Sequence, residues 1–251
     1  MQVARTWGKH EARRSSADMG LSLLGIPFVA NAISGSGMTR LLTDKQRHEL
    51  ESLSTRVDVP PRRVVYREGT ESTSIFICRK GAFKAFRDLP SGRRRVAAFL
   101  FAGDVFGLAE NGRYVNTVQA ITDGRYNRIP LDSLTAVLRH DAELQLVFLT
   151  KVTHALRESQ RRAIILGRRS ATGRLAMFLK MLQRSVVASS PVDVIAVPMS
   201  RTDIANYVGL SAEAISRATA QLTREGIIKF QGLHAVRILD RHRFRFLAAD
   251  I

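Results

Sequence analysis

Cysteine is almost absent from this sequence, and the lack of it excludes several classes of protein. Cys78 is the only thiol, so an intramolecular disulfide, a cysteine-rich zinc site and an iron–sulfur cluster are all excluded. Long apolar runs are lacking as well, since no stretch approaches the ~20 residues that a membrane helix needs. We therefore expect neither a disulfide scaffold nor a membrane-embedded protein.

Acidic residues are also scarce. The 251 residues include 22 Asp and Glu against 39 Lys and Arg, which gives a net charge of +17. With 45% apolar residues and a mean hydropathy of −0.06, the chain should fold in water. No secretion signal is recognisable near the start, so we expect a cytoplasmic protein. Surplus positive charge favours nucleic acid first and an anionic membrane surface second; a basic surface kept for solubility is the alternative.

Residue patterns for catalysis and for metal binding are missing. The sequence contains no Gly-x-Ser-x-Gly, no phosphate-binding loop and no Cys/His nucleophile arrangement. The histidines show no paired spacing that would suit a metal-dependent β-barrel enzyme; they are His10, His48, His140, His154, His234 and His242. We therefore expect no enzyme, no resident metal and no cofactor. Haem stays open as a ligand because it needs only one or two donors.

Residue composition and apolar patterning change along the chain and predict separate segments. Residues 1–36 are rich in Arg, Ser, Gly and Ala and suggest a flexible arm. In the segment 37–139, a short helix opening at Thr43 is followed by short β-type runs with turn signals every eight to twelve residues, a pattern typical of a sandwich or barrel. The predicted strands are 63–66, 74–79, 82–87, 95–100, 116–121 and 125–130.

A long helix is predicted over 140–167. Its apolar or small positions recur at alternating spacings of three and four, which suits pairing with a second helix. They are Leu149, Val152, Leu156, Ser159, Ala163 and Leu166. An amphipathic helix lying on its own barrel explains the pattern equally well. A break rich in Gly and Arg then separates this helix from the segment 168–251.

Residues 199–218 have the spacing of a helix-turn-helix. Ser200, with Asp203 three positions later, resembles a capping arrangement for the first helix. Gly209 can adopt the positive φ that the tight turn requires, and Ser211 is a second N-cap. The positions predicted to face inward are apolar: Ile204, Ala205, Val208, Ile215 and Ala218.

Polar residues occupy the outer face of the second helix in this motif. Arg217 can bond bidentately to guanine, and Glu213 can accept from a cytosine amine. Ser216 and Gln221 lie on the same face. A helical hairpin that docks on another protein is the alternative. Residues 227–239 then alternate like a small β-hairpin, which would form a wing beside the motif.

In this order, the segments resemble the CRP/FNR superfamily of bacterial transcription regulators over about 41–239. The pattern Glu213-Ala-Ile-Ser216-Arg217 is similar to the Glu-x-x-Ser-Arg of the FNR and FixK branch. The resemblance implies an α+β fold with an N-terminal double-stranded β-helix, a jelly-roll that is cyclic-nucleotide-binding-like. A long dimerisation helix and a C-terminal winged helix-turn-helix DNA-binding domain at 168–251 would follow.

The resemblance also implies a function. The protein would be a homodimeric activator of transcription that binds a TTGAT-N4-ATCAA-like palindrome and contacts RNA polymerase. Arg217 would read the guanine, Glu213 the paired cytosine and Ser216 a flanking thymine. Candidate contacts to DNA phosphates are Ser200, Arg201, Ser211, Arg168 and Arg169. Further arginines near the hinge can also reach phosphates: Arg157, Arg161, Arg162 and Arg174.

The sensor half departs from the family. The cyclic-nucleotide pocket of the resembled proteins needs a Gly-Glu pair and an Arg-Ser or Arg-Thr pair. Here the acid is displaced to Glu110, and Tyr114-Val115 stands in place of the phosphate clamp. Cys78 lies in an apolar strand pattern and is expected to be buried and inert. We therefore predict a regulator that is active without a small-molecule effector; the alternative is a β-roll gated by haem or a small anion.

Overall fold

The computed structural model describes residues 42–168, 170–185, 193–232 and 234–249, all within the compact unit Gly35–Ile251. The predicted flexible arm at 1–36 and the loop predicted around 188–191 lie outside these ranges. Within the described ranges, none of the helices has the length and apolar character needed to cross a bilayer.

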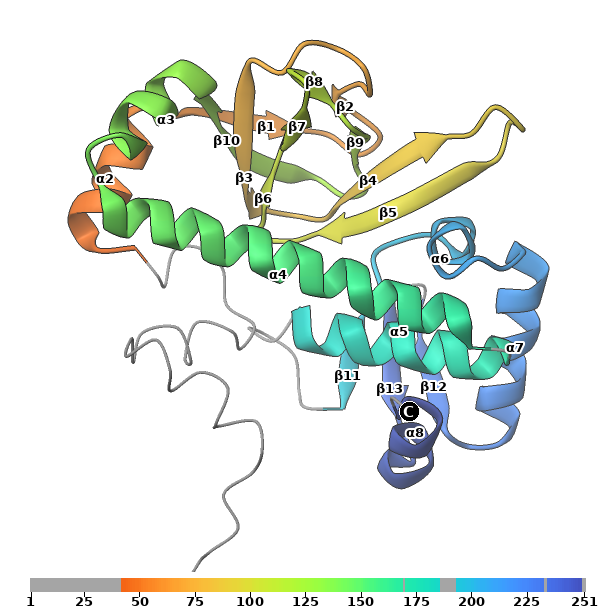
Figure 1. Ribbon diagram of the computed structural model, residues 1–251. Coiled ribbons are helices and arrows are strands. Elements are labelled where there is room, and N and C mark those ends of the chain that lie inside the picture. Colours follow the sequence, from red (N-terminus) through yellow and green to blue (C-terminus); the bar gives the residue numbers. More distant parts are fainter. Residues whose placement is uncertain (1–41, 169, 186–192, 233, 250–251) are drawn as a thin grey trace, which may run out of the picture. The chain divides into compact units, whose positions relative to one another are not determined.

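The first domain is a β-roll that begins after helix α2 (Asp44–Ser52). Thr43 and Gln46 form a capping box that starts this helix. Two antiparallel sheets follow, with strand orders β1-β10-β3-β6 and β2-β9-β4-β5, beside a β7-β8 hairpin (Figure 1). The strands are β1 (Thr55–Val59), β2 (Val64–Tyr66), β3 (Ser74–Lys80), β4 (Phe83–Asp88), β5 (Arg94–Leu100), β6 (Val105–Phe106), β7 (Ala109–Glu110), β8 (Arg113–Tyr114), β9 (Thr117–Ala120) and β10 (Gly124–Pro130).

Aromatic side chains fill the space between the two sheets. Their rings contact one another with centroid separations from 3.9 to 6.3 Å, and Phe83 is completely buried. The rings are those of Tyr66, Phe76, Phe83, Phe106, Tyr114 and Tyr126. Because alternate residues of a strand point to one face, these side chains meet inside the roll.

Helix α3 (Leu131–Leu138) follows β10 and leads to the long helix α4 (Ala142–Gly167). The Asp141 side chain accepts a hydrogen bond from the N–H of Leu144 and caps α4. Leu144 and Val147 are buried near its start, and Ile165 near its end. The helix passes from α3 at one end to α5 and α6 at the other (Figure 1).

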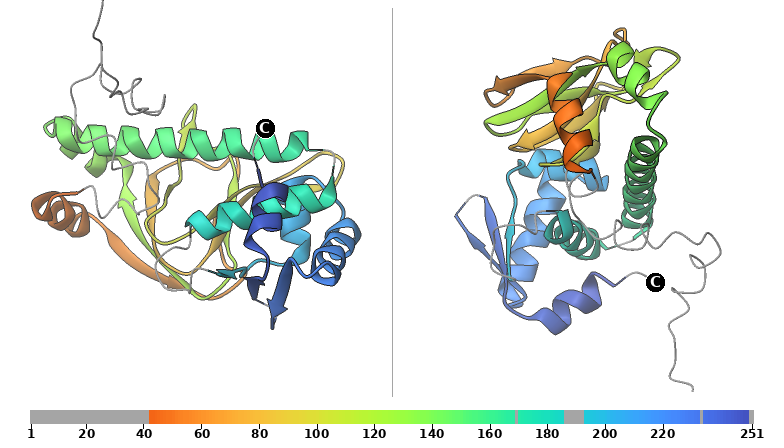
Figure 2. Two further views of the ribbon diagram at one scale, coloured as in Figure 1. Left: turned by 90° about the horizontal axis from the view of Figure 1, so that it is seen from below. Right: turned by 90° about the vertical axis from the view of Figure 1, so that its left-hand side faces the viewer.

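The second domain is a winged helix-turn-helix. It contains α5 (Ala171–Ser185), α6 (Arg201–Val208), α7 (Ala212–Arg224) and α8 (Arg241–Leu247), with a sheet ordered β11-β13-β12. Its strands are β11 (Val194–Ala196), β12 (Ile228–Gln231) and β13 (Ala235–Ile238). Figure 2 shows this sheet and α8 beside the helices of the domain. The predicted order of β-roll, long helix and winged helix-turn-helix is confirmed.

Several short elements escaped the sequence prediction. Strands β6, β7 and β8 have two residues each, too few for an alternating pattern to be seen. Strand β1 was missed as well, although Val57 and Val59 alternate with Arg56 and Asp58; with five residues it offers only two apolar positions. Helix α8 was not predicted either, although Asp240 caps it by accepting from the N–H of Arg243.

Candidate nucleic-acid interface

Helix α6 starts and ends as its sequence predicts. Ser200 is the N-cap: its hydroxyl oxygen accepts from the N–H of Asp203 at 3.0 Å and donates to that residue's Oδ2 at 2.9 Å. Gly209 ends the helix in the left-handed region with φ 71°. A Cβ at Gly209 would lie 2.8 Å from Leu166 Cδ2, the movable end of that side chain, so it is the left-handed backbone conformation that favours glycine here.

Helix α7 carries the predicted base-reading side chains. The Ser211 hydroxyl caps it by accepting from the N–H of Ala214 at 3.0 Å. On one face, Ile215, Ala218 and Leu222 are buried, and the helix packs against α5 and α6. Because the apolar face of α7 packs against these two helices, its opposite face points to solvent.

The outward face of α7 is open and charged. The side chain of Glu213 is 78% exposed and that of Arg217 74% exposed, with Nη1 and Oε1 3.9 Å apart. An exposed pair of this kind contributes little stability, so either group can turn to a base edge at small cost. The Ser216 hydroxyl donates to the carbonyl of Ala212, which leaves its oxygen available as an acceptor. The structure thus places all three predicted base-reading residues on one face.

The predicted phosphate contacts lie in different environments. Ser200, Arg201 and Ser211 are exposed at the N-terminal ends of α6 and α7, where the helix dipole favours an anion. The Arg168 side chain instead contacts Met177, with Nε 3.3 Å from Sδ. Arg169 lies outside the described residues.

Two arginines that we grouped with the phosphate candidates bond to backbone carbonyls within the chain. Arg162 Nε donates to the carbonyl of Tyr207 at 3.1 Å. Arg174 Nη1 donates to the carbonyls of Val208 and Gly209 at 3.1 and 3.2 Å. Cationic donors at these carbonyls satisfy the C-terminal end of α6 and favour its helix dipole. The arginine-rich sequence around the hinge could not distinguish this role from DNA contact.

The seam predicted along α4 is a largely exposed apolar stripe. Leu149, Val152 and Leu156 are 60%, 45% and 58% exposed, so they do not pack on their own β-roll. Ser159 and Ala163 are exposed on the same helix. Leu166 differs, because it is half-buried against the turn at Gly209. Leu146, which is 50% exposed three positions before Leu149, extends the stripe, and the sequence analysis did not include it.

Tyr114, which the family resemblance places at the position of the phosphate clamp, is buried in the β-roll. Its ring stacks on Tyr66 at 3.9 Å between centroids. Its hydroxyl donates to the carbonyl of Ser74 at 2.8 Å and accepts from the N–H of Ser74 at 3.3 Å. The neighbouring Arg113 donates to the carbonyl of Gly69 at 2.7 Å. Both side chains are thus committed to contacts within the roll.

Cys78 is fully buried, as predicted. Desolvation, together with the nearby carboxyl group of Asp104, raises the pKa of its thiol to about 12. Burial also raises the pKa of the Asp104 carboxyl. Because the thiolate is the reactive form, Cys78 behaves as a packing residue.

The β-roll, the long helix and the exposed α7 face define a transcription regulator with a helix-turn-helix DNA-binding domain. Residues 173–247 match the family described as Crp-like helix-turn-helix domain, and residues 56–141 match the cyclic nucleotide-binding domain. The chain belongs to the CRP/FNR family, in its FixK-like branch.

Individual relatives support this assignment. The nitrogen fixation regulation protein FixK of Bradyrhizobium diazoefficiens is 30% identical over 87% of this chain and 92% of its own length. The transcriptional activatory protein AadR of Rhodopseudomonas palustris is 29% identical over 87% and 91%. The solved structure of FixK2 from Bradyrhizobium japonicum is 29% identical, covers 79% of this chain and 98% of its own, and superposes with a TM-score of 0.71. These relatives are named as regulators and not as enzymes.

Proposed function

We propose that this protein is a homodimeric activator of transcription that binds a TTGAT-N4-ATCAA-like palindrome without a small-molecule effector. The observation that carries the proposal is the exposed pair of Glu213 and Arg217 on α7, backed by a buried apolar face. Arg217 would bond to guanine O6 and N7, and Glu213 would accept from the cytosine amine. Ser216 would turn its hydroxyl from the carbonyl of Ala212 to donate to O4 of a flanking thymine.

The apolar stripe on α4 supports the homodimer. Leu146, Leu149, Val152 and Leu156 form a continuous exposed face at spacings of three, three and four, which suits pairing with the same helix of a second copy. In such a twofold assembly, two α7 helices would read half-sites about 34–36 Å apart. The phosphate contacts would come from Ser200, Arg201 and Ser211, with Arg168 and Arg169 near the hinge.

The aromatic filling of the β-roll supports effector independence. A ligand at the phosphate-clamp position would have to displace Tyr114, which is 4% exposed and held by stacking and by two hydrogen bonds to Ser74. Truncating a buried aromatic side chain to alanine costs on the order of 3–5 kcal/mol of stability, and displacing the Tyr114 ring should cost a similar amount. The activity would then follow the amount of protein present.

The names of relatives support the activator role, since AadR of Rhodopseudomonas palustris is a transcriptional activatory protein. An activator of this type would contact RNA polymerase. Transcription in vitro from a promoter that carries the palindrome should rise when the protein is added; a fall would make it a repressor at that promoter.

A gel-shift titration tests DNA recognition and effector independence together. Purified protein without any added ligand should shift a TTGAT-N4-ATCAA duplex. A duplex in which the G·C pair of each half-site is replaced by A·T should bind more weakly. Affinity should also fall steeply with salt, with a slope of about 0.9 per neutralised phosphate. Absence of any shift without ligand contradicts effector independence. An absorbance spectrum of the same sample then tests the alternative of a haem-gated β-roll.

Sedimentation equilibrium tests the dimer. The double substitution Leu149→Asp, Leu156→Asp places two carboxylates in the α4 stripe and should give a monomer that binds a full palindrome poorly. Leu239→Asp is the matched control, because this leucine is also exposed, at 52%, but does not belong to α4. A dimer that survives the double substitution would locate the interface elsewhere.

A further inference from the structure

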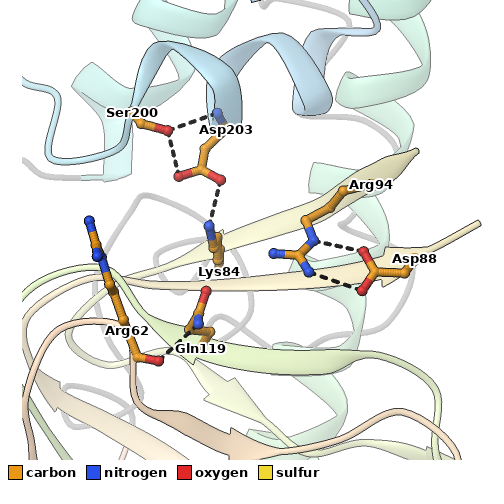
Figure 3. A network of polar contacts seen from close by, with 7 residues as sticks. All are labelled: Arg62, Lys84, Asp88, Arg94, Gln119, Ser200 and Asp203. Carbon is orange, nitrogen blue, oxygen red and sulfur yellow. Dashed lines mark hydrogen bonds and ion pairs between the residues drawn. The ribbon is translucent and has the colours of Figure 1, made fainter. Parts of the chain in front are cut away.

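Helix α6 contacts the β-roll through an ion pair between residues far apart in the chain. Lys84 on β4 places its Nζ 2.6 Å from Oδ1 of Asp203 on α6 (Figure 3). Both side chains are nearly buried, at 12% and 11% exposure. The other carboxylate oxygen of Asp203 accepts from the Ser200 hydroxyl at 2.9 Å. Asp203 thus joins the N-cap of α6 to the β-roll.

Apolar packing surrounds this pair and continues the same contact. The ring of Phe99 on β5 lies 5.2 Å from that of Tyr207 on α6 and 5.8 Å from that of Phe178 on α5, centroid to centroid. Phe86 and Val96 from the same hairpin belong to the core cluster of the DNA-binding domain. Strands β4 and β5 therefore form part of the surface on which α6 rests.

One side of the ion pair borders an open cleft of about 850 Å³. Arg94, which also lines this cleft, is held by Asp88 through two hydrogen bonds of 2.7 and 3.0 Å within the β4–β5 hairpin (Figure 3). The Arg94–Asp88 pair therefore stays within the β-roll, whereas the Lys84–Asp203 pair links the β-roll to α6. Removing one member of a nearly buried pair leaves the other charge without compensation, so such a contact is sensitive to a single substitution.

We infer that Lys84 is a positioning residue for DNA binding, although it lies on the β-roll. By holding Asp203 it orients α6 and the N-cap Ser200, and α6 packs directly against α7. The face of α7 with Glu213 and Arg217 stays exposed in this docked arrangement, so the arrangement is compatible with DNA contact. The inference rests on the proposed function, because it assigns Lys84 a part in presenting the base-reading face.

Operator binding by variants of Lys84 and of a control arginine tests this role. Lys84→Met keeps the unbranched shape of the side chain but removes the ammonium group, and it should weaken binding to the TTGAT-N4-ATCAA duplex roughly tenfold, in the range of coupling seen for contacting residues. Arg87→Met is the matched control: it removes one charge from the same strand, but its partner, Glu68, lies within the β-roll. Binding by Arg87→Met should change less than twofold. Equal affinities for the two variants would overturn the inference.

Two further measurements separate positioning from direct phosphate contact and from a general effect on folding. The slope of affinity against salt should be the same for Lys84→Met and wild type, whereas loss of a phosphate contact lowers it by about 0.9. In an Asp203→Asn background, Lys84→Met should have little additional effect, because the pair is already broken. A lowered slope, or fully additive losses, would contradict the assignment.

Amide hydrogen exchange tests the docking without DNA. Lys84→Met should speed exchange in α6 and in the β4–β5 hairpin, whereas Arg87→Met should leave α6 unchanged. Faster exchange together with no operator binding by the wild type would mean that the proposed function fails while the docking contact stands. Unchanged exchange in α6 would reject the docking role itself.

Discussion

The interior of the β-roll and the outer face of α7 are two surfaces that bear on ligand and DNA binding, and they are built in opposite ways. Inside the roll, aromatic rings contact one another and Phe83 has no exposed area. On α7, Glu213 and Arg217 are mostly exposed and joined by a single long ion pair. The interior of the β-roll is filled by packed side chains, whereas the outer face of α7 carries charged side chains that are exposed to solvent.

This difference is what the proposed function predicts, with DNA binding at α7 and close packing inside the β-roll. Opening the roll would break many ring contacts, which together are worth several kcal/mol. Redirecting Glu213 and Arg217 costs less than about 1 kcal/mol, because an exposed pair is weak. The polar atoms of α7 can therefore bind a partner at little energetic cost, whereas a ligand that enters the interior of the roll would first have to break these ring contacts.

The largest expected effect that tests this comparison is the low reactivity of Cys78. With its thiol pKa raised to about 12, the thiolate fraction at pH 7 should be roughly 3,000-fold below that of a free cysteine with its ordinary value near 8.5. A thiol reagent should label the folded protein very slowly and the urea-unfolded protein rapidly, with Cys78→Ser as the blank. Rapid labelling of the folded form would show that the interior of the roll opens readily.

Next in size is the loss of base reading by Arg217→Ala. Removal of a bidentate guanine contact should cost about 1–3 kcal/mol per half-site and relax the preference for the G·C pair. Titration of the palindrome and of a random duplex measures both effects. An equal loss on the two duplexes would make Arg217 a phosphate contact instead.

A smaller effect is expected when Tyr114 is changed to Phe. The hydroxyl bridges the N–H and the carbonyl of Ser74, and its loss should lower the free energy of unfolding by about 1–2 kcal/mol. Operator affinity should not change. Tyr126→Phe is the control, since Tyr126 lies in the same cluster and should stay within about 0.5 kcal/mol of wild type. Urea unfolding measures both variants; weaker operator binding by Tyr114→Phe would tie the interior of the roll to DNA recognition.

The smallest effect concerns the cap of α4. Asp141→Ala should cost about 1 kcal/mol of stability, while Asp132→Ala, in the first turn of α3 where no side-chain cap bond forms, should cost less. Hydrogen bonds from Leu144 and Gln46 lower the pKa of Asp141 in the folded state. Its contribution should thus be complete above the unfolded value near 3.9 and be lost as the pH falls through the lowered folded value. A difference between wild type and Asp141→Ala that does not shrink in acid would argue against this cap.

Local patterns predicted the DNA-binding half well. Ser200, Gly209 and Ser211 adopt the predicted cap and turn conformations, because each depends on neighbours three or four residues away. The same reasoning could not assign the arginines near the hinge. Arg162 and Arg174 bond to carbonyls 34 to 45 positions further along the chain, a choice that no local pattern records.

The amino-acid sequence by itself determined the order of the domains, the helix caps and the polar face of α7, since these follow from short-range periodicity and hydrogen bonding. Only the tertiary structure decided that Lys84 meets Asp203 across 119 positions and that aromatic rings close the β-roll. Such contacts depend on how the two sheets of the β-roll pack on each other and on the helices of the DNA-binding domain. The alternating apolar pattern of a strand does not specify which distant residue it will contact.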